Sequence, residues 1–273
     1  MNKQQDKFSL KEKTVLITGA LGFLGRSFCK AIADSGASLI LIDLNDKECS
    51  DFAKQLQKNT ENKIIGLGCD ITDENALNNL TKKINDLSIG IDALVNAATY
   101  SSSDQNKISA SFEDYKFDDW KKMTAVNIDG AFLICREVGS LMANQGIGGS
   151  IILMSSIYGF LGTDHRIYER VNKGRGRHNN PAVYSASKGA ILALAKYLAT
   201  YWAGKNIRVN VLSPGGIENK QEQSFINDYI SRVPLNRMGK ADELIGALLF
   251  LASDASSYVT GQNMIIDGGL SAW

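Results

Sequence analysis

A tyrosine and a lysine stand four residues apart in the segment VYSASKGAI, at Tyr184 and Lys188. In a helix this spacing places both side chains on one face. A tyrosine normally keeps its proton far above neutral pH, but a neighbouring lysine charge favours the phenolate and lowers the pKa of the phenol. Such a pair can exchange a proton with an alcohol or a carbonyl. Taken alone, a pair with this spacing is usually an ordinary surface pair, so its surroundings decide the interpretation.

Two serines, Ser155 and Ser156, end the apolar run SIILMS that precedes this helix. If that run is a strand of a parallel sheet, its end lies at the edge where such sheets bind ligands. A serine hydroxyl at this edge can donate a hydrogen bond to the reacting oxygen, and either serine can instead be a simple turn residue. The residues alone therefore indicate an acid–base site without choosing between the two serines.

Three glycines, Gly19, Gly22 and Gly25, lie between the first apolar run and a helical segment in TVLITGALGFLGRSF. Their lack of side chains allows a tight turn, a close approach of the backbone to a pyrophosphate, and close packing of helix on strand. The amides and the positive end of the helix dipole then face the phosphates. This pattern predicts a dinucleotide site. The same turn contains Leu21, Phe23 and Leu24, whose backbone should contact the cofactor.

Asp43 ends the second apolar run, 43 − 25 = 18 residues after the third glycine. A carboxylate at this position can accept hydrogen bonds from both hydroxyls of the adenosine ribose, and it repels a 2′-phosphate. We therefore expect NAD rather than NADP as the cofactor. The alternative is that Asp43 is a solvated turn residue or caps the following helix.

Polar residues also end the third and fourth apolar runs. Asp70, followed by Ile71, can reach the adenine edge of a cofactor, or it can cap a helix together with Thr72. The fourth run closes on an amide and two small residues whose backbone should line the cofactor. These are Asn96, Ala97 and Ala98.

Seven short apolar runs alternate with longer amphipathic segments. This alternation is typical of a parallel sheet with helices on both faces. We therefore expect an α/β fold of the Rossmann type, with a doubly wound parallel sheet of seven strands in a single domain over residues 1–273. The predicted strands are Thr14–Thr18, Ser38–Ile42, Lys63–Gly68, Ile91–Asn96, Ser150–Ser155, Ile207–Ser213 and Asn263–Asp267, and the clearest helices are Asp73–Leu87 and Ala182–Ala203.

The 273 residues are 44% apolar and 22% charged, with a net charge of +1. This balance gives no global field toward nucleic acid or an anionic membrane, so neither is expected as a partner. The start of the chain lacks the apolar run of a signal peptide, and no stretch approaches 18 apolar residues, which predicts a soluble cytoplasmic protein. The four cysteines are widely spaced and are expected to be reduced packing residues. No spacing of metal ligands is visible.

The motifs TGALGFLG, NAAT, AVNIDGAF, MSSIYG, YSASK, LSPGGI, VPLNRMG and VTGQNMIIDGG occur in this order. Together they resemble the short-chain dehydrogenase/reductase family, in its compact single-domain branch, over about residues 13–269. The resemblance implies hydride transfer between a nicotinamide and a secondary alcohol or ketone. It implies that Tyr184 is the acid/base, that Lys188 tunes it and holds the nicotinamide ribose, and that Ser156 rather than Ser155 orients the substrate oxygen. Asn127 completes the implied catalytic tetrad by anchoring a water that relays protons.

The resemblance also implies cofactor contacts after the sixth strand and a homotetramer or, failing that, a homodimer. Three departures from the family pattern stand out. The glycine spacing is that of the family's longer sugar-nucleotide branch, and Asn219 occupies a position where threonine is common. Ser156 and Tyr184 are 184 − 156 = 28 residues apart, where the compact branch has about a dozen. The implied contacts after the sixth strand are Pro214, Gly215, Ile217 and Asn219.

The surplus residues form an insertion at about residues 160–182, in which five basic residues outnumber two acidic ones. The insertion should lie near the substrate, because it begins and ends close to catalytic residues in the sequence. Its cations suit a phosphate or a carboxylate. We expect a small anionic substrate, such as a phosphorylated or nucleotide-linked sugar. The alternative is a solvated loop or a subunit contact. A second lid is expected at about residues 216–232. The candidate substrate residues are Ser156, Tyr158, Arg166, Arg175, Arg177 and His178.

The stretch SSIYGFLGTDHRIYE…NPAVYSASKGAI narrows the resemblance. It is similar to bacterial short-chain dehydrogenases of flagellin and surface-glycan modification, in nonulosonic-acid pathways. A sugar-nucleotide epimerase or dehydratase is a second interpretation, suggested by the glycine spacing. A non-enzymatic dinucleotide-binding protein is a third, because a fold does not fix a function. A lipophilic substrate leaves the cations of the insertion without a role.

Overall fold

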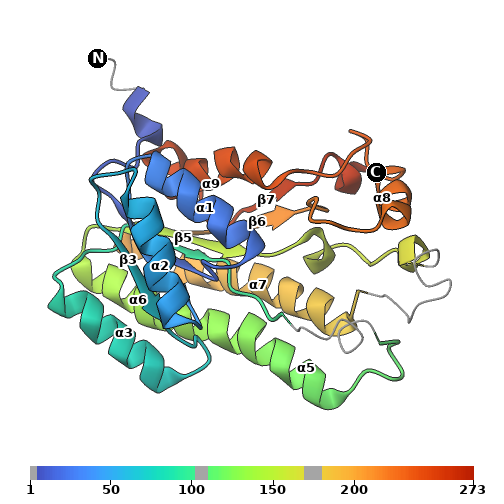
Figure 1. The fold of residues 1–273 in the computed structure, drawn as a ribbon, viewed down its shortest axis with the longest axis horizontal. Helices are drawn as coiled ribbons and strands as arrows, with labels where there is room; N and C mark the ends of the chain where they lie inside the picture. Colours follow the sequence, from blue (N-terminus) through green and yellow to red (C-terminus); the bar gives the residue numbers. More distant parts are fainter. Residues whose placement is uncertain (1–4, 102–109, 169–179) are drawn as a thin grey trace.

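The computed structural model describes residues 5–101, 110–168 and 180–273. Seven strands form one sheet in the order β3-β2-β1-β4-β5-β6-β7, and every neighbouring pair is parallel (Figure 1). This confirms the doubly wound α/β sheet that the apolar runs predict. The strands are β1 (Thr14–Thr18), β2 (Ser38–Asp43), β3 (Ile64–Gly68), β4 (Ala93–Asn96), β5 (Gly149–Met154), β6 (Ile207–Pro214) and β7 (Asn263–Ile266).

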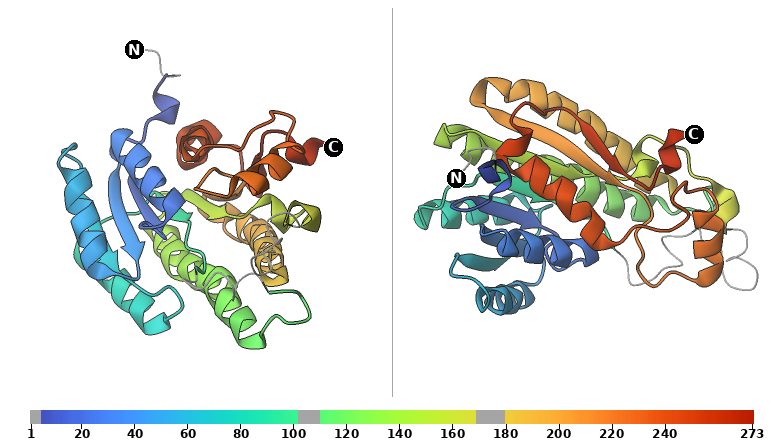
Figure 2. Two further views of the ribbon diagram at one scale, coloured as in Figure 1. Left: turned by 45° about the vertical axis from the view of Figure 1, so that its right-hand side comes forward. Right: turned by 90° about the horizontal axis from the view of Figure 1, so that it is seen from above.

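Helices cover both faces of the sheet, as the two turned views show (Figure 2). One buried cluster joins the sheet to α1, α2 and α9, and a second joins it to α3, α6 and α7. Both faces are therefore apolar, which explains why the strands read as continuous apolar runs rather than alternating ones. The helices with the largest roles are α1 (Phe23–Asp34), α2 (Asp46–Gln57), α3 (Glu74–Asp86), α5 (Phe117–Thr124), α6 (Ala131–Gln145), α7 (Ala182–Tyr201), α8 (Gln223–Ile230) and α9 (Ile245–Ala252).

The parallel strands bring their carboxyl ends to one edge of the sheet, where open α/β sheets bind ligands. The glycine turn follows β1, Asp43 ends β2, and Asn96 ends β4. Ser155 and Ser156 follow β5 directly. Residues that are far apart in the sequence are therefore collected at this edge by topology alone.

The four cysteines are free and buried. Burial raises the pKa of the Cys49 and Cys69 thiols to about 11, so these groups are neutral packing residues near neutral pH. None of the helices within the described ranges is both long and apolar enough to traverse a lipid bilayer.

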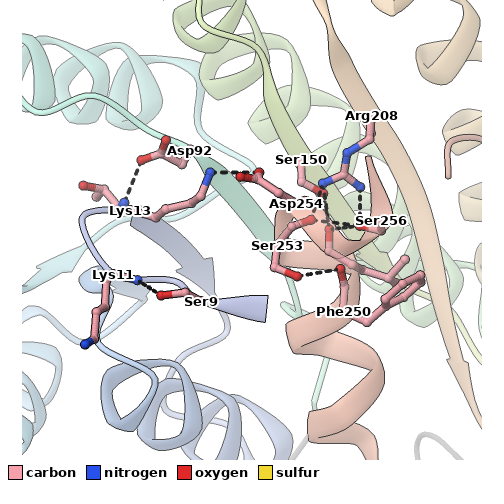
Figure 3. Close-up of polar contacts among 12 residues, drawn as sticks. Ser9, Lys11, Lys13, Asp92, Ser150, Arg208, Phe250, Ser253, Asp254 and Ser256 are labelled. Atoms are coloured by element: carbon pink, nitrogen blue, oxygen red, sulfur yellow. Dashed lines mark hydrogen bonds and ion pairs between the residues drawn. The ribbon is translucent and has the colours of Figure 1, made fainter. Parts of the chain in front are cut away.

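At the opposite edge, where the strands begin, the sheet is stabilised by Arg208, the second residue of β6 (Figure 3). Its Nη1 donates to Ser256 Oγ at 2.7 Å, and its Nη2 donates to the carbonyls of Leu251 and Ser253, both at 3.1 Å. Ser150 Oγ also donates to the Leu251 carbonyl, at 2.7 Å. Because the last carbonyls of α9 have no partners within the helix, a partly buried cation there satisfies them and complements the helix dipole.

Replacing Arg208 by methionine should lower the free energy of unfolding by about 2–4 kcal/mol, because carbonyls at the end of α9 lose a charged donor. Chemical denaturation measures this change. Lys13→Met is a matched control, since Lys13 Nζ pairs at 3.0 Å with Asp254, whose side chain is 70% exposed. Loss of that exposed pair should cost less than about 1 kcal/mol. Equal losses of unfolding free energy in the two variants would show that the Arg208 hydrogen bonds contribute no more than an exposed ion pair.

Candidate active site

The Tyr184–Lys188 pair lies in the first two turns of α7, which begins after Pro181. Proline suits this position because its fixed φ is compatible with a helix start and its missing N–H is not needed there. Lys188 Nζ lies 5.6 Å from the centre of the Tyr184 ring, so the two side chains share one helix face as their spacing predicts. Lys188 is only 5% exposed, and its Nζ donates to the Met154 carbonyl at 3.0 Å.

Burial shifts the proton equilibria of both members of the pair. It lowers the pKa of Lys188 to about 8, because an ammonium is costly away from water. It raises the pKa of the Tyr184 phenol, while a hydrogen bond with Ser156 acts in the opposite direction. Desolvation sets the direction of the Tyr184 shift, and the tuning of the phenol by Lys188 stays a prediction. The Lys188 ammonium is directed at the end of β5.

The two serines after β5 have different roles. Ser155 Oγ is buried and donates to the Lys188 carbonyl at 2.8 Å, which ties α7 to the sheet. Ser156 Oγ accepts a hydrogen bond from the Tyr158 amide at 3.3 Å, and its interaction with the Tyr184 phenol opposes the rise in the pKa of that phenol. The Ser155 hydroxyl is thus used within the protein, which favours Ser156 as the serine that meets a substrate.

Asn127 lies in a π-helical turn, Ala125–Gly130, between α5 and α6. Its side chain is buried and forms hydrogen bonds through both polar atoms: Oδ1 accepts from Thr99 Oγ1 at 3.1 Å and from the Tyr100 amide at 2.8 Å. Nδ2 donates to Ser187 Oγ at 3.0 Å. Sequence reasoning missed Thr99 and Ser187, although both lie inside quoted motifs. Single π turns within helices are frequent at functional sites, which fits a site role for this segment.

The glycine turn is shaped by close backbone contacts. Gly19 has φ +67, and a Cβ there would lie 2.7 Å from the Ala98 backbone nitrogen. A Cβ on Gly25 would lie 2.0 Å from the Gly19 carbonyl oxygen. Gly22 is the N-cap of α1 and offers no side chain to the first amides of the helix. These amides are the groups that bind phosphates, so the turn fits a dinucleotide. Leu21, Phe23 and Leu24 lie in this turn or in the first turn of α1.

Asp43 is tied to the glycine turn rather than to the next helix. Its Oδ2 accepts from the Leu21 amide at 2.9 Å, and its Oδ1 accepts from the Leu44 amide at 2.8 Å. The residue that caps α2 is Asn45, whose side chain accepts from the Glu48 amide. The alternative of a helix cap at Asp43 is therefore wrong. Each carboxylate oxygen still has a lone pair for a ribose hydroxyl.

Asp70 forms a local turn instead of a helix cap. Its Oδ1 accepts from the backbone amide and the hydroxyl of Thr72, at 2.8 and 2.7 Å, while the N-cap of α3 is Asp73. Ile71 is buried against the sheet. Asn96 is also buried, and its side chain accepts from the Thr18 hydroxyl, which joins the ends of β4 and β1.

The segment after β6 folds under a short helix, α8. The Gly216 amide donates to the Tyr229 hydroxyl, and a Cβ on Gly215 would lie 2.9 Å from the Asp267 Cα. Ile217 forms an isolated parallel bridge with Gly239. This close packing fixes the backbone after Pro214 beside the β6–β7 edge. Asn219 is exposed, and its amide donates to the Gln221 side chain at 2.6 Å.

The described start of the insertion is joined to α8 and to the residues after it. Asp164 accepts from Arg166 through both oxygens at 2.8 Å and from Arg232 Nε at 2.6 Å. These cations hold the pKa of Asp164 below its usual range. Arg166 is exposed and is ion-paired with Asp164, so its described contact is with the protein. Three candidate substrate residues lie outside the described residues: Arg175, Arg177 and His178.

A cavity of about 540 Å³ lies beside the first turn of α7. Phe112, Phe117 and Trp120 line it from the α5 side, and Ser185 and Asn180 line it from the α7 side. Asn180 Nδ2 donates to Ser185 Oγ at 3.0 Å. None of the four candidate catalytic residues lines this cavity, whose walls are mainly apolar and include several aromatic rings.

Comparison with known proteins agrees with this geometry. The family model described as Enoyl-(Acyl carrier protein) reductase matches residues 19–271. The 2-dehydro-3-deoxy-D-gluconate 5-dehydrogenase of Pseudoalteromonas atlantica (strain T6c / ATCC BAA-1087) is 32% identical over 275 residues, covering 97% of this chain and 98% of that protein.

Two solved structures share the whole fold. A gluconate 5-dehydrogenase from Burkholderia cenocepacia J2315, in complex with NADP and tartrate, is 28% identical with a TM-score of 0.87 and covers 99% of both chains. A short chain dehydrogenase from Leptospira borgpetersenii serovar Hardjo-bovis (Strain JB197), with bound NAD+, is 32% identical with a TM-score of 0.84. It covers 99% of this chain and 96% of its own. The present chain therefore belongs to the short-chain dehydrogenase/reductase family and is a nicotinamide-dependent oxidoreductase that acts on alcohol groups.

Proposed function

We propose that this enzyme prefers NAD and oxidises a secondary hydroxyl of a polyhydroxylated, anionic sugar derivative, or reduces the corresponding ketone. The observation that carries the proposal is the placement of Tyr184 and Lys188 on one face of α7. Lys188 Nζ bonds the end of β5, directly before Ser155 and Ser156, and the glycine turn lies at the same sheet edge. The sugar-acid dehydrogenase among the relatives supports the substrate class. A gluconate 5-dehydrogenase among the similar structures supports it as well.

Four side chains divide the work at the reacting carbon. Ser156 Oγ donates a hydrogen bond to the substrate oxygen and holds it against the Tyr184 hydroxyl. During alcohol oxidation the Tyr184 phenolate, formed when the phenol passes its proton to the relay water, accepts the hydroxyl proton. During ketone reduction the phenol donates that proton. A bound nicotinamide supplies the hydride acceptor or donor at its C4. Lys188 offers an ammonium to the ribose and to the developing phenolate. Asn127, whose side-chain oxygen and amide are already engaged, orders the backbone around a relay water.

The NAD preference rests on Asp43. Its carboxylate lies at the end of β2 and holds the glycine turn through the Leu21 amide, so a 2′-phosphate would meet a fixed negative charge. The similar structures contain both cofactors, NADP in one and NAD+ in the other, so this preference comes from the residue itself.

Replacing Asp43 by serine should change the ratio of kcat/KM for NAD to that for NADP by at least about 10-fold toward NADP, since the repulsion and the ribose contact are both lost. Steady-state rates with each cofactor measure this ratio. Asp51→Ser, a matched change at an exposed position on α2, should leave the ratio unaltered. An unchanged ratio in Asp43→Ser would remove the basis for the NAD preference.

The anionic character of the substrate rests on the insertion. We propose that three residues of the insertion and two residues before it hold a phosphate, a carboxylate or a nucleotide diphosphate. The insertion residues are Arg175, Arg177 and His178, and the other two are Ser156 and Tyr158. A place in surface-glycan or nonulosonic-acid biosynthesis is supported by the sequence resemblance alone. A homotetramer, or a homodimer, is proposed from the same resemblance. The stacked, exposed rings of Tyr197 and Tyr201 on α7 offer an apolar surface consistent with such a contact.

The aromatic cavity favours a second candidate function, oxidation or reduction of a lipophilic substrate. Its volume of about 540 Å³ and its lining by Phe112, Phe117 and Trp120 suit an apolar group. On this account the insertion would contribute apolar walls through Leu161 rather than cations.

NADH formation by the purified protein separates the two candidates. The panel contains sugar acids, sugar phosphates, nucleotide sugars, neutral polyols and lipophilic secondary alcohols, each tested with NAD and with NADP. Turnover that is confined to the anionic sugar derivatives supports the proposed function. Turnover of lipophilic alcohols alone would replace it by the second candidate. If neutral polyols were turned over as efficiently as anionic sugars, the enzyme would not require an anionic group on its substrate.

A further inference from the structure

The cavity of about 540 Å³ beside the first turn of α7 is not used by the acid–base chemistry. Its volume lies within the range of small-molecule sites and exceeds what a single hydroxyl or phosphate needs. Ser185, which lines the cavity, directly follows Tyr184 in the sequence of α7. The cavity can therefore hold a part of the substrate that is remote from the reacting carbon but belongs to the same molecule.

The insertion builds one wall of this cavity. Thr163 comes from the described start of the insertion and Asn180 from its described end, and both line the cavity. Asn180 Nδ2 donates to Thr163 Oγ1 at 2.8 Å and to Ser185 Oγ at 3.0 Å, so one amide joins both ends of the insertion to α7. The start is also fixed by the ion pair between Asp164 and Arg232 at 2.6 Å. The residues that this chain adds to the family pattern thus give the cavity a firmly held polar wall.

The polar wall offers both hydrogen-bond donors and acceptors. Because both amide hydrogens of Asn180 are engaged, its Oδ1 is the atom that can accept a hydrogen bond from a ligand. The hydroxyls of Thr163 and Ser185 accept from this amide and can each donate to a ligand as well. A purely aliphatic ligand would remove these groups from water without replacing their hydrogen bonds, which costs free energy. The wall therefore suits a ligand with donors and acceptors along one edge.

The wall on the α5 side is aromatic. Phe112, Phe117 and Trp120 line it, and Phe112 and Phe117 are 77% and 71% exposed. Two exposed phenylalanines at one cavity form an apolar surface of the kind that marks ligand-binding grooves. Planar bases stack on such rings, and the loss of one stacking ring weakens binding roughly 10- to 100-fold. This wall therefore suits the flat face of an aromatic ligand.

We propose that this cavity binds the base of a nucleotide-linked sugar while the sugar lies at Tyr184. A base has flat apolar faces for the aromatic wall, and it has donors and acceptors along its edge for Asn180 and the two hydroxyls. This inference rests on the proposed function and narrows its anionic sugar derivatives to those that carry a nucleoside diphosphate. Arg175 and Arg177, which precede Asn180 in the sequence, are the cations already proposed for the diphosphate.

The first test is calorimetry on the full chain with NAD at saturation, so that the dinucleotide site is occupied. The ligands are UDP, GDP, CDP and ADP, with inorganic pyrophosphate as the probe that lacks a base. At least one nucleoside diphosphate should bind about 10-fold or more tightly than pyrophosphate, because its base adds stacking to the contacts of the phosphates. Equal affinities for all five ligands, or no binding of any nucleoside diphosphate, overturn the base site.

Three variants test whether the base lies in this cavity. Phe112→Ala and Phe117→Ala should each weaken nucleoside diphosphate binding about 10-fold, with no change in pyrophosphate affinity, NAD affinity or thermal midpoint. Asn180→Ala should reduce the preference for one base over the others, because the polar edge is lost. Phe8→Ala, which removes a phenylalanine that is 56% exposed and does not line the cavity, is the matched control. Wild-type affinity in both Phe112→Ala and Phe117→Ala overturns the assignment.

The same proteins separate two other occupants. If Phe112→Ala and Phe117→Ala reduced the turnover of lipophilic alcohols alone, an apolar group would occupy the cavity. If they dissociated an oligomer in sedimentation without affecting nucleoside diphosphate binding, a second copy of the chain would cover it. Both outcomes overturn the base site. Turnover of sugar phosphates but of no nucleotide sugar also overturns it and leaves the proposed function standing, whereas turnover of no anionic sugar overturns both.

Discussion

Tyr184→Phe should reduce kcat by about 10³-fold, with little change in NAD affinity, because only the hydroxyl that transfers the proton is removed. The ring keeps its packing on α7, so the fold and the dinucleotide site should be preserved. Steady-state rates together with NAD titration by fluorescence measure the two effects separately. Tyr201→Phe, which removes the hydroxyl of an exposed tyrosine at the end of the same helix, is the matched control and should retain the wild-type rate.

The size of this loss also discriminates between roles for the phenol. A residue that only orients the substrate would affect KM more than kcat, whereas an acid/base affects kcat and kcat/KM together. A fall of less than about 10-fold in kcat would contradict the assignment of Tyr184 as the proton-transferring group. Such a result would leave Ser156 and an ordered water as the remaining route for the proton.

Lys188→Met should abolish most of the activity and also remove a pH dependence from protein stability. The folded-state pKa of Lys188 is lowered from 10.5 to about 8, so the unfolded chain binds more protons between these two values. Wild-type stability therefore carries a contribution that rises as the pH rises from about 8 to 10.5. The full contribution is on the order of 3 kcal/mol, since each unit of pKa shift corresponds to about 1.4 kcal/mol.

The measurement is the difference in unfolding free energy between wild type and Lys188→Met, taken from pH 7 to pH 10 by urea denaturation. Taking the difference cancels the titration of the buried tyrosines and cysteines that both proteins share. The wild type should gain relative to the variant as the pH increases. Lys196→Met, on the exposed side of α7, is the control that should show no such trend. A difference in unfolding free energy that stays constant from pH 7 to pH 10 would mean that burial does not lower the pKa of Lys188.

The strands were predictable because both faces of the sheet are buried, so that each strand reads as a continuous apolar run. The predicted start of β4 was two residues early for a specific reason. Ile91 donates its amide to Gln145 Oε1 at 2.8 Å and accepts from Gln145 Nε2 at 3.0 Å, so its backbone is paired with a side chain. An apolar residue next to a strand cannot reveal such pairing from its type.

At the site, the sequence did not reveal which side chains are removed from water or which charges are paired within the protein. Helical spacing gave the shared face of Tyr184 and Lys188, but it could not show how far each side chain is removed from water. Desolvation sets the direction of both pKa shifts. The charge pattern drew attention to the cations of the insertion. Arg166, however, forms an ion pair with Asp164, a contact within the insertion that the charge pattern does not reveal.

The most direct test of the account follows the hydride itself. The substrate identified by the panel is labelled with deuterium at the carbon that bears the reacting hydroxyl, and it is incubated with NAD and the enzyme. We expect deuterium to accumulate at C4 of the nicotinamide in the NADH formed, and we expect Tyr184→Phe to slow this transfer about 10³-fold. Conversion of the substrate without deuterium on the released cofactor would contradict net oxidation and indicate an epimerase or dehydratase.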